Sequence, residues 1–267
     1  MRAIGLDDPM ILGLHGVFVR HPWIDQVSAG CDLDEDVFSL AINRAAAYGW
    51  SFPLSSDREE VRGQRWGHND ADGDWTEDGS VRELAWLQVE VEDLRGQRLP
   101  VLPMATVLGD GLRRVGTFRL TGMHTLAPVH LAADGSAELR GAAAWFRLAD
   151  PHHGVDLTVE VSARAPDRLA ARAPEILDLV RERNWAGTGI ETAPAGRPRD
   201  GLAEPAEGEI RYGGMRPALA LRCRAPEWSL NVAAWATDLL VDALRAARTA
   251  ERVLITVTVP AGEPQGG

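Results

Sequence analysis

The sequence predicts an α+β fold built from two halves, residues 1–150 and 151–260. Apolar residues alternate with polar ones along much of the chain, which is typical of half-buried strands. A long stretch with helical periodicity, Trp228–Arg248, lies between two such strands. The tetrapeptide Arg-Ala-Pro-acid occurs twice between a predicted strand and a predicted helix, 60 residues apart. These observations agree with one another and indicate a repeated order of strands and helices in the second half.

The C-terminal half ends in a strand–helix–strand unit, Pro217–Val259. Residues 219, 221 and 223 alternate along a short strand, and residues 253–259 alternate along the closing strand. Between them, Pro226 and Glu227 precede the helix. Proline fits the first helical turn, and an acid there interacts favourably with the positive end of the helix dipole. We therefore expect a helix from Trp228 to Arg248.

The same order of elements is predicted once before in this half. Residues 156–163 form a strand, Arg164-Ala-Pro166-Asp167 follows it, and a helix extends to about Asn184. Pro174 either bends this helix or restarts it in a new first turn. A hairpin around Gly213-Gly214 then leads into the last unit. The order β-α-β-β-α-β is that of a ferredoxin-like fold, which we expect for residues 151–260, with 261–267 as a disordered tail.

The N-terminal half is expected to be an antiparallel sheet that carries one main helix. Met10–Arg20 is apolar enough for a first strand, and acids before an apolar face predict a helix at residues 35–48. From residue 84 to 148 the apolar period changes to two, and Asp110-Gly111 and Asp134-Gly135 are typical hairpin turns. This half should form a meander that packs against the second half or shares its sheet.

The composition narrows the classes of partner. The chain of 267 residues has a net charge of -11, of which -9 lies in residues 1–150. A phosphate-binding surface needs clustered positive charge, so we expect neither nucleic acid nor an anionic membrane as a partner. All 28 basic residues are arginine, a lysine-free composition that we attribute to a GC-rich bacterial genome.

Several features predict a cytoplasmic protein without a cofactor or a metal. No charged-then-apolar leader and no run of 18 apolar residues is present. Two cysteines, Cys31 and Cys223, are too few for a disulfide framework or a four-thiolate site, and Cys223 is expected in the core. The sequence contains no Walker loop, dinucleotide fingerprint, nucleophile elbow or zinc-hydrolase helix motif. A homo-oligomer is compatible with these features.

Residues 51–83 form the least regular part of the sequence, rich in acids and with two tryptophans. A large aromatic side chain in a polar loop is costly unless it anchors onto the fold or onto a partner. We therefore predict a non-catalytic interaction factor, of the assembly, adaptor or immunity type, that binds another protein with a basic surface. Calcium binding is the alternative for this loop, but its spacing does not match the EF-hand template: counted from Asp70 both the Gly and the Glu are missing, and counted from Asp72 only the final Glu fits. The predicted partner-binding residues are Trp66, Asp70, Asp72, Asp74, Trp75, Glu77 and Asp78.

The competing prediction is a small-molecule-binding protein or an enzyme with a pocket between the sheet and the helices, since α+β architectures carry many unrelated functions. The six-residue spacing of His124 and His130 puts them too far apart on one strand to share a metal ion. The acid–base candidates for such a pocket are His124, His130, Asp150 and His152.

Overall fold

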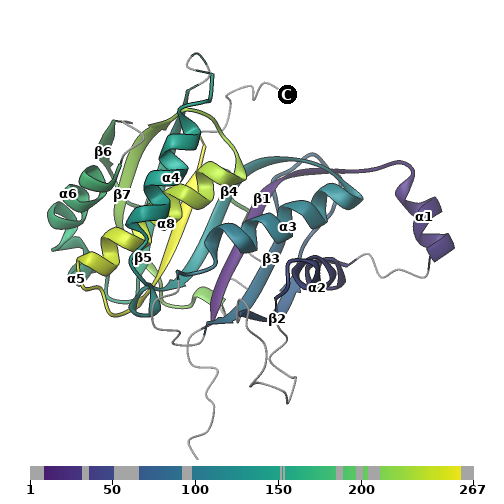
Figure 1. The fold of residues 1–267 in the computed structure, drawn as a ribbon, viewed down its shortest axis with the longest axis horizontal. Coiled ribbons are helices and arrows are strands. Elements are labelled where there is room, and N and C mark those ends of the chain that lie inside the picture. Colours follow the sequence, from purple (N-terminus) through teal and green to yellow (C-terminus); the bar gives the residue numbers. More distant parts are fainter. Residues whose placement is uncertain are drawn as a thin grey trace, which may run out of the picture.

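One antiparallel sheet of eight strands contains strands from both halves of the chain (Figure 1). The computed structural model describes residues 9–31, 36–50, 66–91, 98–150, 152, 154–184, 189–196, 201–203 and 211–259, and at positions 28, 31 and 66–69 it describes the backbone alone. The strands lie in the order β2-β3-β1-β4-β8-β5-β7-β6. Their bounds are β1 Met10–Arg20, β2 Trp66–Asp72, β3 Arg82–Val91, β4 Gly116–Pro128, β5 Val155–Ala163, β6 Ile190–Ala193, β7 Arg216–Ala225 and β8 Arg252–Thr258.

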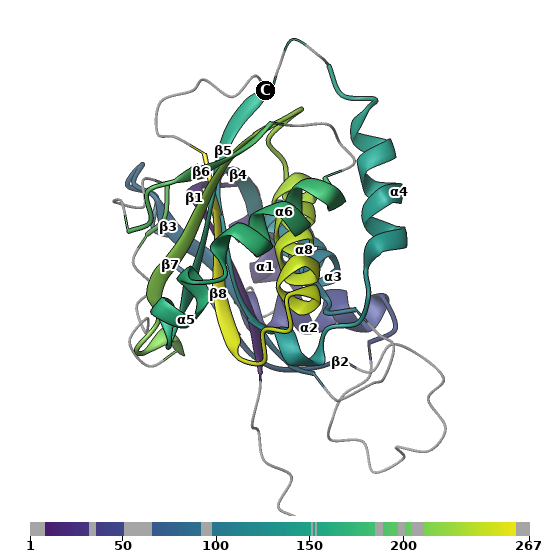
Figure 2. The same ribbon diagram turned by 90° about the vertical axis from the view of Figure 1, so that its left-hand side faces the viewer.

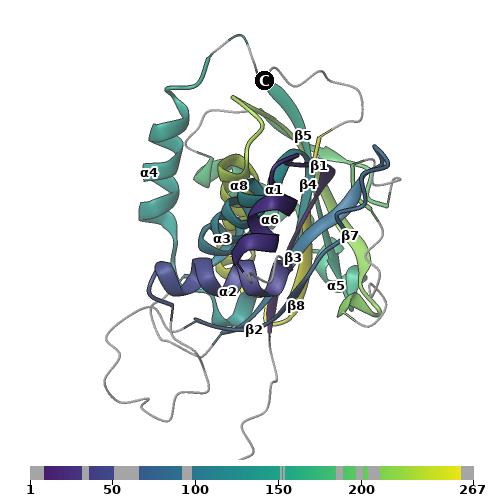
Figure 3. The ribbon, with the colours of Figure 1, turned by 90° about the vertical axis from the view of Figure 1, so that its right-hand side faces the viewer.

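The helices cover one face of this sheet (Figure 2). α2, α3, α6 and α8 lie side by side on that face, and α4 packs onto α8 and α6 from outside (Figure 3). α1 lies beyond the end of β1, apart from this layer (Figure 1). Among the described helices, none is long and apolar enough to cross a membrane. The helices are α1 Ile24–Cys31, α2 Val37–Ala47, α3 Val101–Val115, α4 Ser136–Phe146, α5 Pro166–Ala170, α6 Ala173–Arg183 and α8 Leu230–Ala246, and η1 Val129–Leu131 is a short 3-10 turn.

The two halves of the sheet repeat one strand order. The first half reads β4-β1-β3-β2 and the second reads β8-β5-β7-β6, so the first strand of each half lies between its fourth and third strands. In each half a helical segment follows the first strand and another follows the third. The halves meet where β4 pairs with β8, with Met123 opposite Val257. Both halves thus belong to one continuous sheet.

Successive side chains along each strand point to opposite faces of the sheet, and the two faces differ in what covers them. Met10, Leu12 and Leu14 of β1 point into the main core beneath the helices, whereas Ile11 points to the opposite face. The helix side carries most of the buried aliphatic residues, and α8 is buried along nearly its whole length. The other face, called the open face below, has a smaller apolar cluster of Ile11, Trp86, Leu126 and Leu254.

A buried ionic group fixes α4 and α6 against α8. Asp242 of α8 accepts hydrogen bonds from Arg183 Nε at 2.7 Å and from the backbone N–H of Gly135 at 3.1 Å. Asp238, one turn earlier, pairs with Arg98 at 2.7 Å. Burial raises the pKa of Asp238 to about 7, against the lowering effect of Arg98. These pairs tie helices together and account for the charges within the helical layer.

The expected meander between residues 84 and 148 is wrong. Among the described residues of this stretch, β3 and β4 are the strands, and α3, η1 and α4 are helical, so the N-terminal half carries more than one main helix. Asp110-Gly111 lies inside α3 and is not a hairpin turn. Glycine in this segment was interpreted as a turn residue, whereas Gly109 allows two helices to pack closely: a Cβ at Gly109 would lie 2.4 Å from Leu230 of α8. Asp134-Gly135 does make a turn, but the turn leads into α4.

Other predictions are confirmed within about two residues. β1 has the predicted bounds, and α2 begins after Asp36, whose side chain accepts a hydrogen bond from Ser39 N at 2.6 Å. The predicted helix after β5 restarts, because α5 ends and α6 begins with Pro174 in its first turn. The hairpin predicted around Gly213-Gly214 is wrong: residues 211–214 form a helical turn, and the strand that pairs with β7 is β6, Ile190–Ala193. The tail 261–267 and residues 51–65 of the acidic loop lie outside the described residues.

Candidate functional site

A cluster of buried polar side chains lies on the open face, where the adjacent strands β3, β1 and β4 meet. His15 of β1, Glu83 of β3 and His124 of β4 are each nearly inaccessible to solvent. Arg211 and Tyr212, from the connection between β6 and β7, pack against them from outside the sheet. Five polar side chains from distant parts of the sequence therefore meet at one place, which we call the open-face cluster.

Gly13 makes room for this cluster. It lies opposite His124 in the β1–β4 pairing, and the imidazole covers its Cα position. A Cβ at Gly13 would lie 2.1 Å from His124 Cε1, closer than any real contact. The absence of a side chain at position 13 lets the His124 ring lie flat against β1 and reach His15.

Hydrogen bonds run through the cluster in one direction. The backbone N–H of Ala203 donates to His15 Nδ1 at 3.1 Å, so the His15 proton must be on Nε2. His15 Nε2 then donates to His124 Nδ1 at 2.7 Å, which places the His124 proton on Nε2. That nitrogen donates to Tyr212 Oη at 2.5 Å. This assignment of tautomers satisfies all four ring nitrogens with both histidines neutral.

An ion pair completes the cluster. Arg211 donates to Glu83 from both terminal nitrogens, at 3.3 and 2.9 Å, and its guanidinium lies 4.3 Å from the centre of the Trp86 ring. This forked pairing is the strong form of an arginine–carboxylate bond. Glu83 Oε1 is also 3.6 Å from His124 Nε2. The charge of a buried carboxylate is thus compensated by a guanidinium held over an aromatic ring.

The electrostatics favour neutral side chains in this cluster. Burial, and then the nearby Arg211 charge, lower the pKa of His15 from 6.5 to about 3. Burial also raises the pKa of Tyr212 far above its ordinary value. Both shifts agree with the tautomers that the hydrogen bonds require. At neutral pH the cluster therefore holds one compensated charge pair and a chain of neutral donors and acceptors.

His15, Glu83 and His124 offer three ligand atoms within 4.8 Å of one another, which is close enough to consider a metal site. Their hydrogen bonds do not fit one. A histidine that binds a metal through Nε2 donates its Nδ1 proton to an acceptor, whereas His15 Nδ1 faces the N–H of Ala203. The nitrogen separation of 2.7 Å is a hydrogen-bond length, and Arg211 already compensates Glu83. We therefore interpret His15, Glu83 and His124 as polar groups of the sheet that hold Ala203, Arg211 and Tyr212 against the open face by hydrogen bonds.

The predicted contact region is ordered where the structure describes it, and its carboxylates have two roles. Asp74 and Asp78 pair with Arg82, and their other oxygens accept hydrogen bonds from the turn that they form. The side-chain bond from Arg82 holds the pKa of Asp78 well below its usual range. By contrast, Asp70 and Asp72 each accept a hydrogen bond from the backbone N–H of the next residue, and both are exposed. They carry their charge toward solvent.

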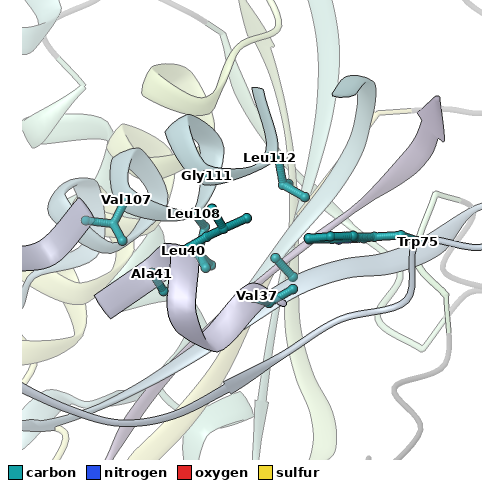
Figure 4. A pocket seen from close by; sticks show the side chains of 9 residues that line it. Val37, Leu40, Ala41, Trp75, Val107, Leu108, Gly111 and Leu112 are labelled. Carbon is teal, nitrogen blue, oxygen red and sulfur yellow. The ribbon is translucent and has the colours of Figure 1, made fainter. Parts of the chain in front are cut away.

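Trp75 anchors this acidic turn to the fold. Its ring stacks on Phe18 at 5.6 Å, and its Nε1 donates to Leu84 O at 2.8 Å. Figure 4 shows Trp75 between the strands and the helices, at the edge of a small apolar cavity. Trp66 begins the edge strand β2, and its side chain lies outside the described residues. Trp75 therefore fixes the turn in place.

The acidic turn adjoins an exposed apolar group. Glu77 accepts a hydrogen bond from the backbone N–H of Arg20 at 2.7 Å, at the end of β1. Next to Arg20 lie Val19 and Trp23, whose residues are 56% and 47% exposed, and Val27 of α1 is exposed as well. We call Val19, Trp23, Val27 and Glu77, together with Asp70 and Asp72 farther along the edge strand β2, the acidic–apolar surface. The pairing of β2 with β3 and of β3 with β1 places Asp70 and Asp72 level with Ile11 and Gly13 of β1.

The residues predicted for the alternative pocket occupy different environments. His124 is buried in the open-face cluster, while His130, Asp150 and His152 are exposed. Asp150 does meet His152, because its side chain accepts the backbone N–H of that residue at 2.9 Å. The hydrogen bonds of the His124 ring go to His15 and Tyr212 instead.

Two apolar cavities lie between the sheet and the helices in the described part of the chain. Each has a volume of about 10 Å³, the lower limit for one water molecule. The first lies between α2, α3 and Trp75 (Figure 4), and the second adjoins Cys223 and Trp235. Burial raises the pKa of Cys223 to about 11, which keeps its thiol protonated. Neither cavity is lined by a histidine or a carboxylate.

Sequence reasoning missed His15, Glu83, Arg211 and Tyr212 as partners of His124. A usable signal was present: His15 and His124 both lie on apolar predicted strands, where a buried polar residue needs a partner. The histidines were compared within one strand, whereas the pairing that joins them is between β1 and β4. Comparison with protein-family models, curated proteins and solved structures found no match to the chain.

Proposed function

We propose that this protein is a non-catalytic interaction factor, of the assembly, adaptor or immunity type, that binds a basic protein through its acidic–apolar surface. The observation that carries the proposal is the hydrogen bond from Arg20 N to Glu77 at 2.7 Å. It joins an anchored acidic turn to the exposed apolar residues at the end of β1 and in α1. Exposed aromatic groups beside fixed charges are typical of contact surfaces.

The charges on this surface support a basic partner. Asp74 and Asp78 are compensated by Arg82, so they shape the turn and contribute little outward charge. Asp70, Asp72 and Glu77 have no arginine partner among the described residues, in a chain whose net charge is -11. Carboxylates of this kind steer a basic partner and set specificity, while a half-exposed tryptophan supplies the contact area.

Copurification from cells that contain the natural partner tests the proposal. Wild-type protein, Trp23→Ala, the double variant Asp70→Asn/Asp72→Asn and the control Trp145→Ala are used as bait in equal amounts. Trp145 is 65% exposed on α4, which makes it a matched tryptophan away from the proposed surface. One basic protein should be recovered with the wild type and the control. The other two variants should reduce its recovery about tenfold, which corresponds to about 1.4 kcal/mol.

The dependence of partner recovery on ionic strength provides a second test of the proposal. Exposed charge pairs are screened as ionic strength rises, so recovery by the wild type should fall in high salt. The double variant should show a weaker salt dependence, because it lacks two of the steering charges. Equal recovery with all four baits would reject the proposal. Recovery that only Trp145→Ala reduces would move the contact surface to α4.

We also propose that both halves are ferredoxin-like, since each has two helical segments and the antiparallel strand order of a split β-α-β fold. From the sequence, this fold was expected only for residues 151–260. A cytoplasmic location is proposed from the two cysteines, of which Cys223 is a free buried thiol.

A further inference from the structure

Two described pieces of the β6–β7 connection, residues 201–203 and 211–215, lie on the open face. They touch the sheet at separate points: Gly201 O accepts from Thr121 Oγ1 at 2.6 Å, and Ala203 N donates to His15. Arg211 and Tyr212 bind Glu83 and His124. Tyr212 and Met215 also pack on the apolar cluster of the open face. We call these two pieces the strap.

We propose that the strap is a pH-sensitive cover, latched onto the open face while His15 is neutral and released when His15 takes a second proton. The inference is independent of the acidic–apolar surface, because none of the residues involved belongs to it.

The direction of the hydrogen bonds makes the latch sensitive to one proton. His15 Nδ1 is the only acceptor on its ring, since Nε2 donates to His124. A second proton would occupy Nδ1 and would face the N–H of Ala203, so two donors would point at each other. The protonated ring would therefore break the bond to the strap, and the Ala203 N–H would lose its acceptor.

Burial and Arg211 oppose protonation of His15 in the closed state, and four charged or titratable groups surround its ring. On the sheet these are His124 of β4 and Glu83 of β3, and on the strap they are Arg211 and Tyr212. Glu83 would favour a cation, but it is already paired with Arg211. The Arg211 charge adds to burial and keeps the pKa of His15 at about 3. Lifting the strap removes Arg211 and admits water, which restores the ordinary pKa of about 6.5.

Proton linkage then gives the pH dependence of the equilibrium between the closed and open strap. Between pH 6.5 and about 3 the open state binds a proton that the closed state does not, so acid favours opening. The equilibrium constant for opening should increase about tenfold for each pH unit in this window. Opening would expose Ile11, Trp86, Leu126 and Leu254, which form an apolar patch suited to a second contact.

Hydrogen exchange tests the proposal on the intact protein. The amide of Ala203 donates directly to His15, and that of Val257 belongs to β8 at the centre of the sheet. Protection factors, corrected for the intrinsic pH dependence of exchange, are measured for both amides from pH 7 to pH 4. The protection of Ala203 should fall about tenfold per pH unit below 6.5, while that of Val257 stays high. A constant protection factor for Ala203 would overturn the proposal.

Two variants distinguish the effect of His15 protonation from the effects of acid on other groups. His15→Asn keeps an acceptor near the Nδ1 position but cannot be protonated, so the pH dependence of Ala203 exchange should disappear. His21→Asn is the control, because His21 is not buried and stacks on Trp23 at 4.8 Å. In this variant the exchange of the Ala203 amide should show the same pH dependence as in the wild type. A pH dependence that persists in His15→Asn would assign the effect to Glu83 and reject the latch.

A measurement on the wild type covers the case in which His15→Asn does not fold. The nitrogen chemical shifts of the His15 ring at pH 7 report which nitrogen carries the proton. The latch requires the Nε2–H tautomer, since Nδ1 accepts from Ala203. Observation of the Nδ1–H tautomer, or of a doubly protonated ring, would contradict the proposal.

Discussion

Gly13 is the residue on which the geometry of the open-face cluster depends most. Gly13→Ala should destabilise the protein by about 1–3 kcal/mol, because the new methyl group would enter the space of the His124 ring, which is fixed by hydrogen bonds at both nitrogens. Chemical denaturation measures the change. Gly141→Ala in α4 is the control, since nothing lies within 4 Å of a Cβ there and helix propensity should improve. Equal effects of the two variants would show that Gly13 is not tightly packed.

The chain contains two tyrosines, which allow a matched comparison at the same scale. Tyr212→Phe should cost about 1–3 kcal/mol, because the buried Nε2–H of His124 would lose its acceptor. Tyr48→Phe should cost less: its hydroxyl bonds Arg44 and Asp110 at an exposed position where water replaces it. Thermal denaturation of both variants checks the difference. A larger loss for Tyr48→Phe would contradict the buried hydrogen bond between Tyr212 and His124.

At the scale of elements, the two glycines of α3 serve different purposes. Gly111→Ala should stabilise the protein by up to about 1 kcal/mol, because the nearest atom to a Cβ is an ordinary contact at 3.5 Å and alanine favours helix. Gly109→Ala places a Cβ 2.4 Å from Leu230 Cδ1, so the gain in propensity should be offset or outweighed by repacking against α8. Urea titrations measure both. Equal stabilisation by the two substitutions would mean that α3 and α8 are not closely packed here.

The same helix shows what could and could not be predicted from the sequence. Strands β5, β7 and β8 were predictable because each shows period-two alternation, and β1 was predictable because Met10–Arg20 is a continuous, mostly apolar run. α3 was not, because Gly109 and Gly111 are typical of turns, and the close helix contact that requires one of them is made with a residue about 120 positions later. Local rules describe local structure; packing between α3 and α8 is not local.

The candidate site also has one part that could be predicted from the sequence and one part that could not. The acidic turn was visible in the sequence because its carboxylates are adjacent along the chain. The open-face cluster was not, because it depends on the β1–β4 register and on a connection that crosses the sheet. The role of Trp75 also needed the fold, since its stacking on Phe18 joins the β2–β3 connection to β1, and no sequence pattern relates these two segments.

At the scale of the whole molecule, the β4–β8 pairing should make the two halves unfold together. Seven residue pairs join these strands at the centre of the sheet, and α3 of the first half packs on α8 of the second. Hydrogen exchange of Leu12 in β1 and Val159 in β5 should therefore report the same free energy of opening. Values that differ by more than about 1 kcal/mol would show that the halves are separate cooperative units.

The proposed function depends on one contact, that of the acidic–apolar surface with the basic partner. Hydrogen exchange of the protein alone and in complex with the recovered basic partner tests it most directly. The account predicts new protection at residues 19–27 and 70–80, the two segments joined by the Arg20–Glu77 hydrogen bond, and none at Trp145 and Leu148 of the α4 region. Protection confined to α4, or to any region that excludes residues 19–27 and 70–80, would contradict the claim.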